Sequence, residues 1–127
     1  MAIMNPAKTP ITLFGIPNCN TVKLARAWLA EHCVPVHFHD FKKQGVPADL
    51  LPGWLQRAGW ETLVNRKGTT WRQLDEATRA SIVDAASATD LMLSHPSVIK
   101  RPVAVWPNGQ ISVGFTATDF AARLDRS

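Results

Sequence analysis

The chain has 127 residues, which suits one domain of ordinary size and is too short for two. With 46% hydrophobic and 19% charged residues, its composition excludes disordered, collagen-like and disulfide-rich secreted proteins. The net charge of +4 favours anionic partners in general, without indicating nucleic acid. No apolar run approaches the ~18 residues of a membrane helix, and the first residues lack the features of a signal peptide, so we expect a cytoplasmic protein with no membrane partner.

The first half of the chain predicts a β-α-β unit. Residues 1–10 carry no periodic pattern and are predicted to be a flexible leader to a single domain over 11–127. Ile11–Phe14 is a short apolar run bounded by a glycine and a proline, as is typical of a buried strand. Apolar residues then recur at helical spacing over 19–32, and 35–41 alternates apolar residues with histidines, which predicts a second, half-buried strand.

A helical insertion is predicted over about 47–95, where no strand pattern occurs and leucines recur at helix-like intervals. The first helix of this segment is the least certain, because Pro52-Gly53 falls where its interior would be. Thr89-Asp90 resembles the cap of a last helix that would run to His95 and stop at the following proline.

The last third of the chain predicts two strands and a helix. The apolar run 103–106 and the alternating run 110–113 are joined by Pro107-Asn108-Gly109, whose Asn-Gly dipeptide is a strong hairpin signal. Thr116-x-x-Asp119 resembles a capping box at the start of a final helix. The order β-α-β, helices, β-β-α predicts an α/β protein with a thioredoxin-like fold, in which a mixed four-stranded sheet carries a helical insertion.

Cys19 is the first candidate for chemistry, because it lies where a helix begins. Unpaired N–H groups and the positive end of the helix dipole stabilise a thiolate there, although a buried, inert thiol is the alternative interpretation. Cys33 is 14 residues further along, or roughly 21 Å on one helix, which exceeds the ~7 Å limit for a disulfide. Position 22, where a Cys-x-x-Cys pair would have its second sulfur, is Val22. The site is therefore predicted to be monothiol, with an external thiol such as glutathione as its resolving partner.

Cations elsewhere in the chain are candidates for anion binding. Arg101-Pro102 precedes the hairpin, where thioredoxin-type folds place a cis proline beside the cysteine, while a surface arginine before a trans proline is the alternative. The segment 65–72 gathers cations, hydroxyls and a glycine, which could cradle an anion or simply face solvent. The four histidines share no ligand spacing with carboxylates, and the tryptophans are scattered, so neither a metal site nor a nucleic-acid partner is expected.

Four ordered motifs together resemble the arsenate reductase-like (ArsC/Spx) family, and within it the YffB-like subgroup. They are Ile11–Lys23, Gly68–Arg72, Asp84–Ser87 and Lys100–Pro102, and the similarity extends over about residues 11–125. The resemblance implies a thioredoxin-like fold, a nucleophilic cysteine at Cys19, and an active-site arginine at Arg101 before a cis Pro102.

The chain also departs from the arsenate-reducing members of that family, which use arginines to hold the oxyanion. It lacks the histidine that those enzymes have in the turn before the cysteine. A second family arginine falls within Asn65-Arg66-Lys67, where the stricter placement gives Asn65, and a third is missing from Ser112–Gly114. The resemblance therefore points to thiol chemistry more than to arsenate reduction.

The sequence as a whole predicts a monothiol oxidoreductase that is a glutathione-dependent thiol/disulfide reductase. The alternatives are a glutathione/glutaredoxin-coupled arsenate reductase, an Spx-like RNA polymerase-binding regulator and a non-enzymatic thiol-binding module. We expect a monomer with no bound cofactor or metal, glutathione as co-substrate, a glutathionylated or disulfide substrate, and glutaredoxin as an optional partner. Besides the catalytic Cys19, the predicted substrate-binding residues are Asn20, Thr21, Lys23, Arg66, Lys67, Arg101 and Pro102.

Overall fold

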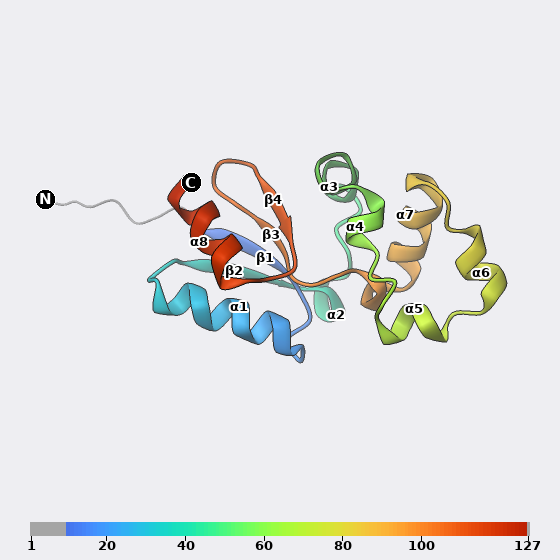
Figure 1. Ribbon diagram of the computed structural model, residues 1–127, viewed down its shortest axis with the longest axis horizontal. Helices are drawn as coiled ribbons and strands as arrows, with labels where there is room; N and C mark the ends of the chain where they lie inside the picture. Colours follow the sequence, from blue (N-terminus) through green and yellow to red (C-terminus); the bar gives the residue numbers. More distant parts are fainter. Residues whose placement is uncertain (1–9, 127) are drawn as a thin grey trace, which may run out of the picture.

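The computed structural model describes residues 10–126, and a sheet lies at one side of it and most of the helices at the other (Figure 1). The sheet has the strand order β2-β1-β3-β4. Strand β1 is parallel to β2 and antiparallel to β3, and β3 is antiparallel to β4. The strands are β1 (Ile11–Gly15), β2 (Val36–Asp40), β3 (Val103–Val105) and β4 (Ile111–Val113). This mixed sheet, interrupted by a helical insertion, confirms the predicted fold class.

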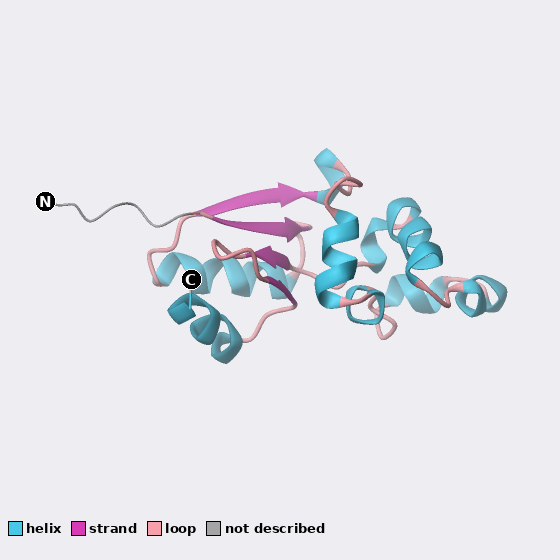
Figure 2. Ribbon diagram, turned by 90° about the horizontal axis from the view of Figure 1, so that it is seen from above, coloured by secondary structure: helices cyan, strands magenta, loops and turns pink. Residues whose placement is uncertain are grey.

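Helix α1 connects β1 to β2, α8 follows β4, and the remaining helices lie between β2 and β3 (Figures 1 and 2). The predicted leader lies outside the described residues, apart from Pro10. Within 10–126 no helix is both long and apolar enough to span a bilayer. The helices are α1 (Asn20–Glu31), α2 (Phe41–Gln44), α3 (Leu51–Ala58), α4 (Trp60–Leu63), α5 (Thr69–Gln73), α6 (Glu76–Ser81), α7 (Ala85–Ser94), the 3-10 turn Pro96–Val98 and α8 (Ala117–Arg126).

The predicted cap at Thr89-Asp90 is wrong, because both residues lie inside α7. The helix begins after Asp84, whose side chain accepts a hydrogen bond of 2.9 Å from the backbone N–H of Ser87. The Ser87 hydroxyl in turn accepts from the backbone N–H of Asp84, which completes a capping box. Asp84 has the extended backbone that a cap requires, whereas the Thr89 hydroxyl donates back to the Ala85 carbonyl within the helix.

Alternation along the strands divides the core into two layers. Leu13 and Ala104 face α1 and α8, and their layer includes Phe120 of α8. Phe14 and Val103 face the other way, toward the helices of the insertion. Because successive strand residues point to opposite faces, both sides of the short sheet are covered by helices.

A short backbone ladder joins the segment after α4 to the segment before β3, on either side of α5–α7. Val64 and Ile99 form an isolated antiparallel bridge. The N–H of Asn65 donates to the Val98 carbonyl at 2.8 Å, and the N–H of Lys100 donates to the Leu63 carbonyl at 2.7 Å. This ladder lies directly before β3 and fixes Asn65 and Lys100 relative to the sheet.

Candidate active site

Cys19 is the N-cap residue of α1, as the sequence predicts. Its backbone is extended, with φ −137° and ψ 123°, and its side chain makes no capping bond, so the sulfur is left for other partners. The first turn of α1 packs closely on the end of β1, because Gly15 has no side chain. A Cβ atom at Gly15 would lie only 2.9 Å from Cγ2 of the buried Val22.

The pKa of the Cys19 thiol is lower than that of an ordinary cysteine. Partial burial acts to raise it, but the N–H of Val22, a hydrogen bond and the positive charge from Arg101, and the N–H of Thr21 together outweigh burial. The helix start and one arginine thus favour the thiolate, which is the nucleophilic form of cysteine. Since no histidine contributes, the activation differs from that implied for enzymes with a histidine in the turn.

Arg101 approaches the thiol from the segment before β3. The Arg101–Pro102 peptide bond is cis, as the resemblance implies. One guanidinium nitrogen, Nη1, donates to the Ser97 carbonyl at 2.9 Å, which anchors the side chain. Nε of Arg101 is buried and has no hydrogen-bond partner among residues 10–126. Because a buried unpaired donor is costly, this N–H group is suited to donate a hydrogen bond to a ligand or to the thiolate.

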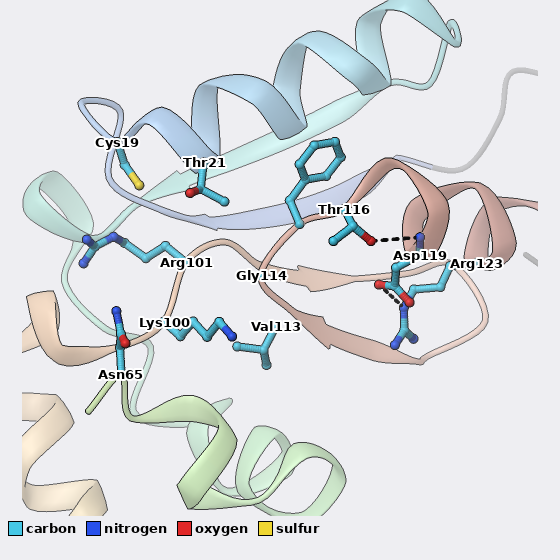
Figure 3. Close-up of a pocket in the computed structure, with 11 residues that line it drawn as sticks. Cys19, Thr21, Asn65, Lys100, Arg101, Val113, Gly114, Thr116, Asp119 and Arg123 are labelled. Atoms are coloured by element: carbon cyan, nitrogen blue, oxygen red, sulfur yellow. Dashed lines mark hydrogen bonds and ion pairs between the residues drawn. The ribbon is translucent and has the colours of Figure 1, made fainter. Parts of the chain in front are cut away.

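Cys19 and Arg101 line one end of a pocket with a volume of about 570 Å³ (Figure 3). This volume lies within the range of ~300–1,000 Å³ that is typical of small-molecule sites. The pocket runs from the start of α1 past the end of β4 to the first turns of α8. Its lining residues are Cys19, Thr21, Asn65, Lys100, Arg101, Val113, Gly114, Phe115, Thr116, Asp119 and Arg123.

Of the predicted site residues, the structure brings Cys19, Thr21 and Arg101 together at this pocket. Asn20, Lys23 and Pro102 are not among the residues that line it, although Asn20 and Pro102 are each adjacent in sequence to a lining residue. Lys23 is an exposed residue of α1 and does not line the pocket, so the structure gives no support to its predicted role in substrate binding.

Arg66 and Lys67 also lie away from the pocket, and Asn65 lines it in their place. The backbone ladder fixes Asn65, and the chain then turns, with the Gly68 N–H donating to the Asn65 carbonyl at 3.2 Å. Lys67 is exposed, and Arg66 lies 4.0 Å from the Glu61 carboxylate. Of the alternatives within Asn65–Lys67, the placement at Asn65 is therefore the one that reaches the pocket.

Three charged residues of the pocket are not predicted from the sequence as site residues: Lys100, Asp119 and Arg123. Ser112–Gly114 supplies no cation, as predicted, but the side chain of Lys100, from the segment before β3, lies beside Gly114. A Cβ atom at Gly114 would lie 3.3 Å from Cε of Lys100. The available signals were the position of Lys100 beside Arg101 and the i, i+4 spacing of Asp119 and Arg123 on the last predicted helix.

Comparison with known proteins places the chain in a family. A sequence model of the ArsC family matches residues 14–122. The chain belongs to the ArsC family. It is 38% identical over 112 residues to an uncharacterized protein of Haemophilus influenzae, a match that covers 88% of this chain and 96% of that one.

Solved structures of ArsC-family relatives have the same architecture. The YffB protein is 46% identical, with a TM-score of 0.84 over 90% of this chain and 98% of that chain. An arsenate reductase (ArsC) related protein from Brucella melitensis is 45% identical, with a TM-score of 0.73 over 94% and 98% of the two chains. These similarities confirm the arsenate reductase-like family and its thioredoxin-like fold.

Proposed function

We propose that this ArsC-family protein is a monothiol reductase that removes glutathione from mixed disulfides. The observation that carries the proposal is the position of Cys19, whose pKa is lowered by the Val22 N–H and by Arg101 at the end of an open pocket. Both cysteines are free, and Cys33 is an exposed residue just after the far end of α1. Cys19 therefore has no second sulfur nearby to resolve an intermediate.

The reaction consists of two thiol–disulfide exchanges. The Cys19 thiolate attacks the glutathione sulfur of a mixed disulfide, a Cys19–glutathione disulfide forms, and the substrate leaves as a thiolate that takes up a proton. A second glutathione, as thiolate, then attacks the bound glutathione sulfur, which releases the Cys19 thiolate and oxidised glutathione. In total the substrate sulfur is reduced to a thiol, one added glutathione thiol is joined to the glutathione of the mixed disulfide as oxidised glutathione, and the protein is regenerated.

The pocket gives less support to two of the alternative functions, arsenate reduction and Spx-like regulation. The resemblance implies that arsenate-reducing members hold the oxyanion with arginines, whereas this chain has Asn65 at one implied position and no cation within Ser112–Gly114. A Cys-x-x-Cys redox switch, implied for Spx-like regulators, would need a second cysteine where the chain has the fully buried Val22. The pocket therefore lacks residues that the resemblance implies for each of these alternatives.

The proposal is tested with Cys19→Ser and Cys33→Ser variants of the full chain. The substrate is a glutathionylated peptide, glutathione is in excess, and formation of oxidised glutathione is followed through glutathione reductase. We expect Cys19→Ser to abolish activity and Cys33→Ser to retain it. Mass spectrometry after exposure to oxidised glutathione should locate one glutathione on Cys19. Equal loss in both variants, or arsenite release from arsenate at a comparable rate, would refute the monothiol scheme.

A further inference from the structure

The helical insertion leaves part of one sheet face open. Phe14 and Val103, which pair across β1 and β3, are buried beneath its helices. On the same face, further along the strands, Thr12, Val105 and Ile111 lie side by side in one cross-strand row. These three residues are only half-buried, so the insertion does not close over them. We call this row the open row.

A groove of about 400 Å³ lies between the open row and helix α3, which contacts β4 (Figure 1). Its wall includes Phe14 and Trp54, whose rings meet edge to face with centroids 4.7 Å apart. Leu50 also lines the groove and is 43% exposed, so apolar surface there is within reach of solvent. The volume and the mainly apolar lining are those of a small-molecule site. We call this space the α3 groove.

Arg57 lies at one end of the α3 groove with an unpaired guanidinium group. Its Nη1 would lie 3.3 Å from a Cβ atom at Gly53, so the side chain folds back over the bare Cα of that glycine. It makes no hydrogen bond or ion pair with any residue in the part of the chain that the structure describes. The Pro52-Gly53 pair thus has a role in α3: the proline stands in the first turn, where its missing N–H costs nothing, and the glycine makes room for the guanidinium.

The two ends of the α3 groove differ in charge. Asp49 lies before the first turn of α3 and Arg57 in its last turn, so about two helical turns separate the two charges, which form no ion pair. Beyond Arg57 a polar space continues along the hairpin to Arg123, which adds positive charge at that end. A negative group is therefore favoured beside Arg57 and disfavoured beside Asp49.

We infer that the α3 groove binds an apolar monocarboxylate, whose carboxylate meets Arg57 and whose apolar body lies over the open row. A planar guanidinium with free donors suits a carboxylate, and the apolar lining suits the body of the ligand. A second carboxylate at the other end of the ligand would meet Asp49. The inference goes beyond the proposed function and does not depend on it, because no residue that lines the α3 groove lines the pocket at Cys19.

The test is an amide NMR titration of the full chain with octanoate, which reports both the affinity and the place of binding. Octanamide has the same apolar chain without the charge, and octanedioate adds a carboxylate at the far end. The variants are Arg57→Gln and Asp49→Asn, both at exposed positions. Arg72→Gln, at an exposed position of α5, is the matched control.

We expect octanoate to cause saturable shifts at the amides of Leu50 and Ile111, with binding weakened about three- to tenfold by Arg57→Gln and unchanged by Arg72→Gln. Octanamide should bind more weakly than octanoate, and equally to the wild type and to Arg57→Gln. Octanedioate should also bind more weakly than octanoate, and Asp49→Asn should reduce that difference. Absence of saturation, saturable shifts confined to residues around Cys19, or equal weakening by Arg72→Gln would overturn the inference.

Discussion

Replacement of Arg101 by glutamine should raise the pKa of the Cys19 thiol. Arg101 lowers this pKa through a hydrogen bond and through charge, and burial opposes it. The variant removes both contributions, while the N–H groups of Val22 and Thr21 stay in place. Burial is then opposed only by the backbone, so the thiolate should be stabilised less.

The size of this effect follows from Coulomb's law. Unit charges at about 4 Å interact with about 1 kcal/mol in water and about 4 kcal/mol at an effective dielectric constant of about 20. Because Cys19 is only partly buried, solvent screening favours the lower part of this range, about 1–2 kcal/mol. Since 1.4 kcal/mol corresponds to a factor of about ten, the thiolate fraction well below the midpoint should fall about five- to thirtyfold.

The assay is the pH dependence of iodoacetamide alkylation in a Cys33→Ser background, where Cys19 is the only thiol. The midpoint for Arg101→Gln should move to higher pH. The midpoint for Arg101→Lys should lie between those of Arg101→Gln and the parent, since lysine keeps the charge but loses the planar guanidinium group. The plateau at high pH should rise slightly, because a more basic thiolate is a better nucleophile. Replacement of Arg57, an exposed residue of α3, by glutamine is the charge-matched control. A midpoint for Arg101→Gln equal to that of the parent would refute the reasoning.

Two further predictions concern the support of the site. Gly15→Ala should lower the free energy of unfolding by about 1–3 kcal/mol, because the new methyl group meets Val22 at 2.9 Å, and it should slow Cys19 alkylation as the helix start is displaced; an unchanged melting temperature would contradict this. Ser112→Ala should cost about 1–3 kcal/mol in denaturant unfolding, because the buried Trp106 indole N–H loses its acceptor at 2.9 Å. The exposed Ser81→Ala serves as the control, and an equal effect of the two serine variants would count against a role for burial.

The local features of the fold are largely predictable from the sequence. Strand β1 and the hairpin follow from short apolar runs between glycine and proline residues, and α1 begins at Cys19 as its periodicity indicates. The N-cap of α7 is harder to predict, because the residue types at Thr89-Asp90 and at Asp84 are all common at helix N-termini. Only the backbone conformation and the reciprocal bonds with Ser87 distinguish them.

The far end of the pocket is not predictable by the same means. Lys100, Asp119 and Arg123 are ordinary surface residue types in sequence, and they become a group only because the fold brings the start of α8 and the segment before β3 to one pocket. Arg66 and Lys67 show the opposite case, in which a conspicuous run of cations lies outside the pocket. A charge pattern along the chain shows where cations occur in the sequence. It does not predict which of them face a pocket, because the direction of each side chain depends on contacts between distant segments.

The ladder that joins Leu63–Asn65 to Val98–Lys100 has a consequence for how this protein can change. The chain leaves the pocket region at Asn65 and returns to it at Lys100, so helices α5–α7 form a closed excursion. Insertions or deletions in the loops between these helices should displace neither residue, whereas Leu91 and Met92 of α7 share a buried core cluster with Phe14 of β1. The excursion is thus a part of the molecule where new surfaces can evolve while the geometry around Cys19 is conserved.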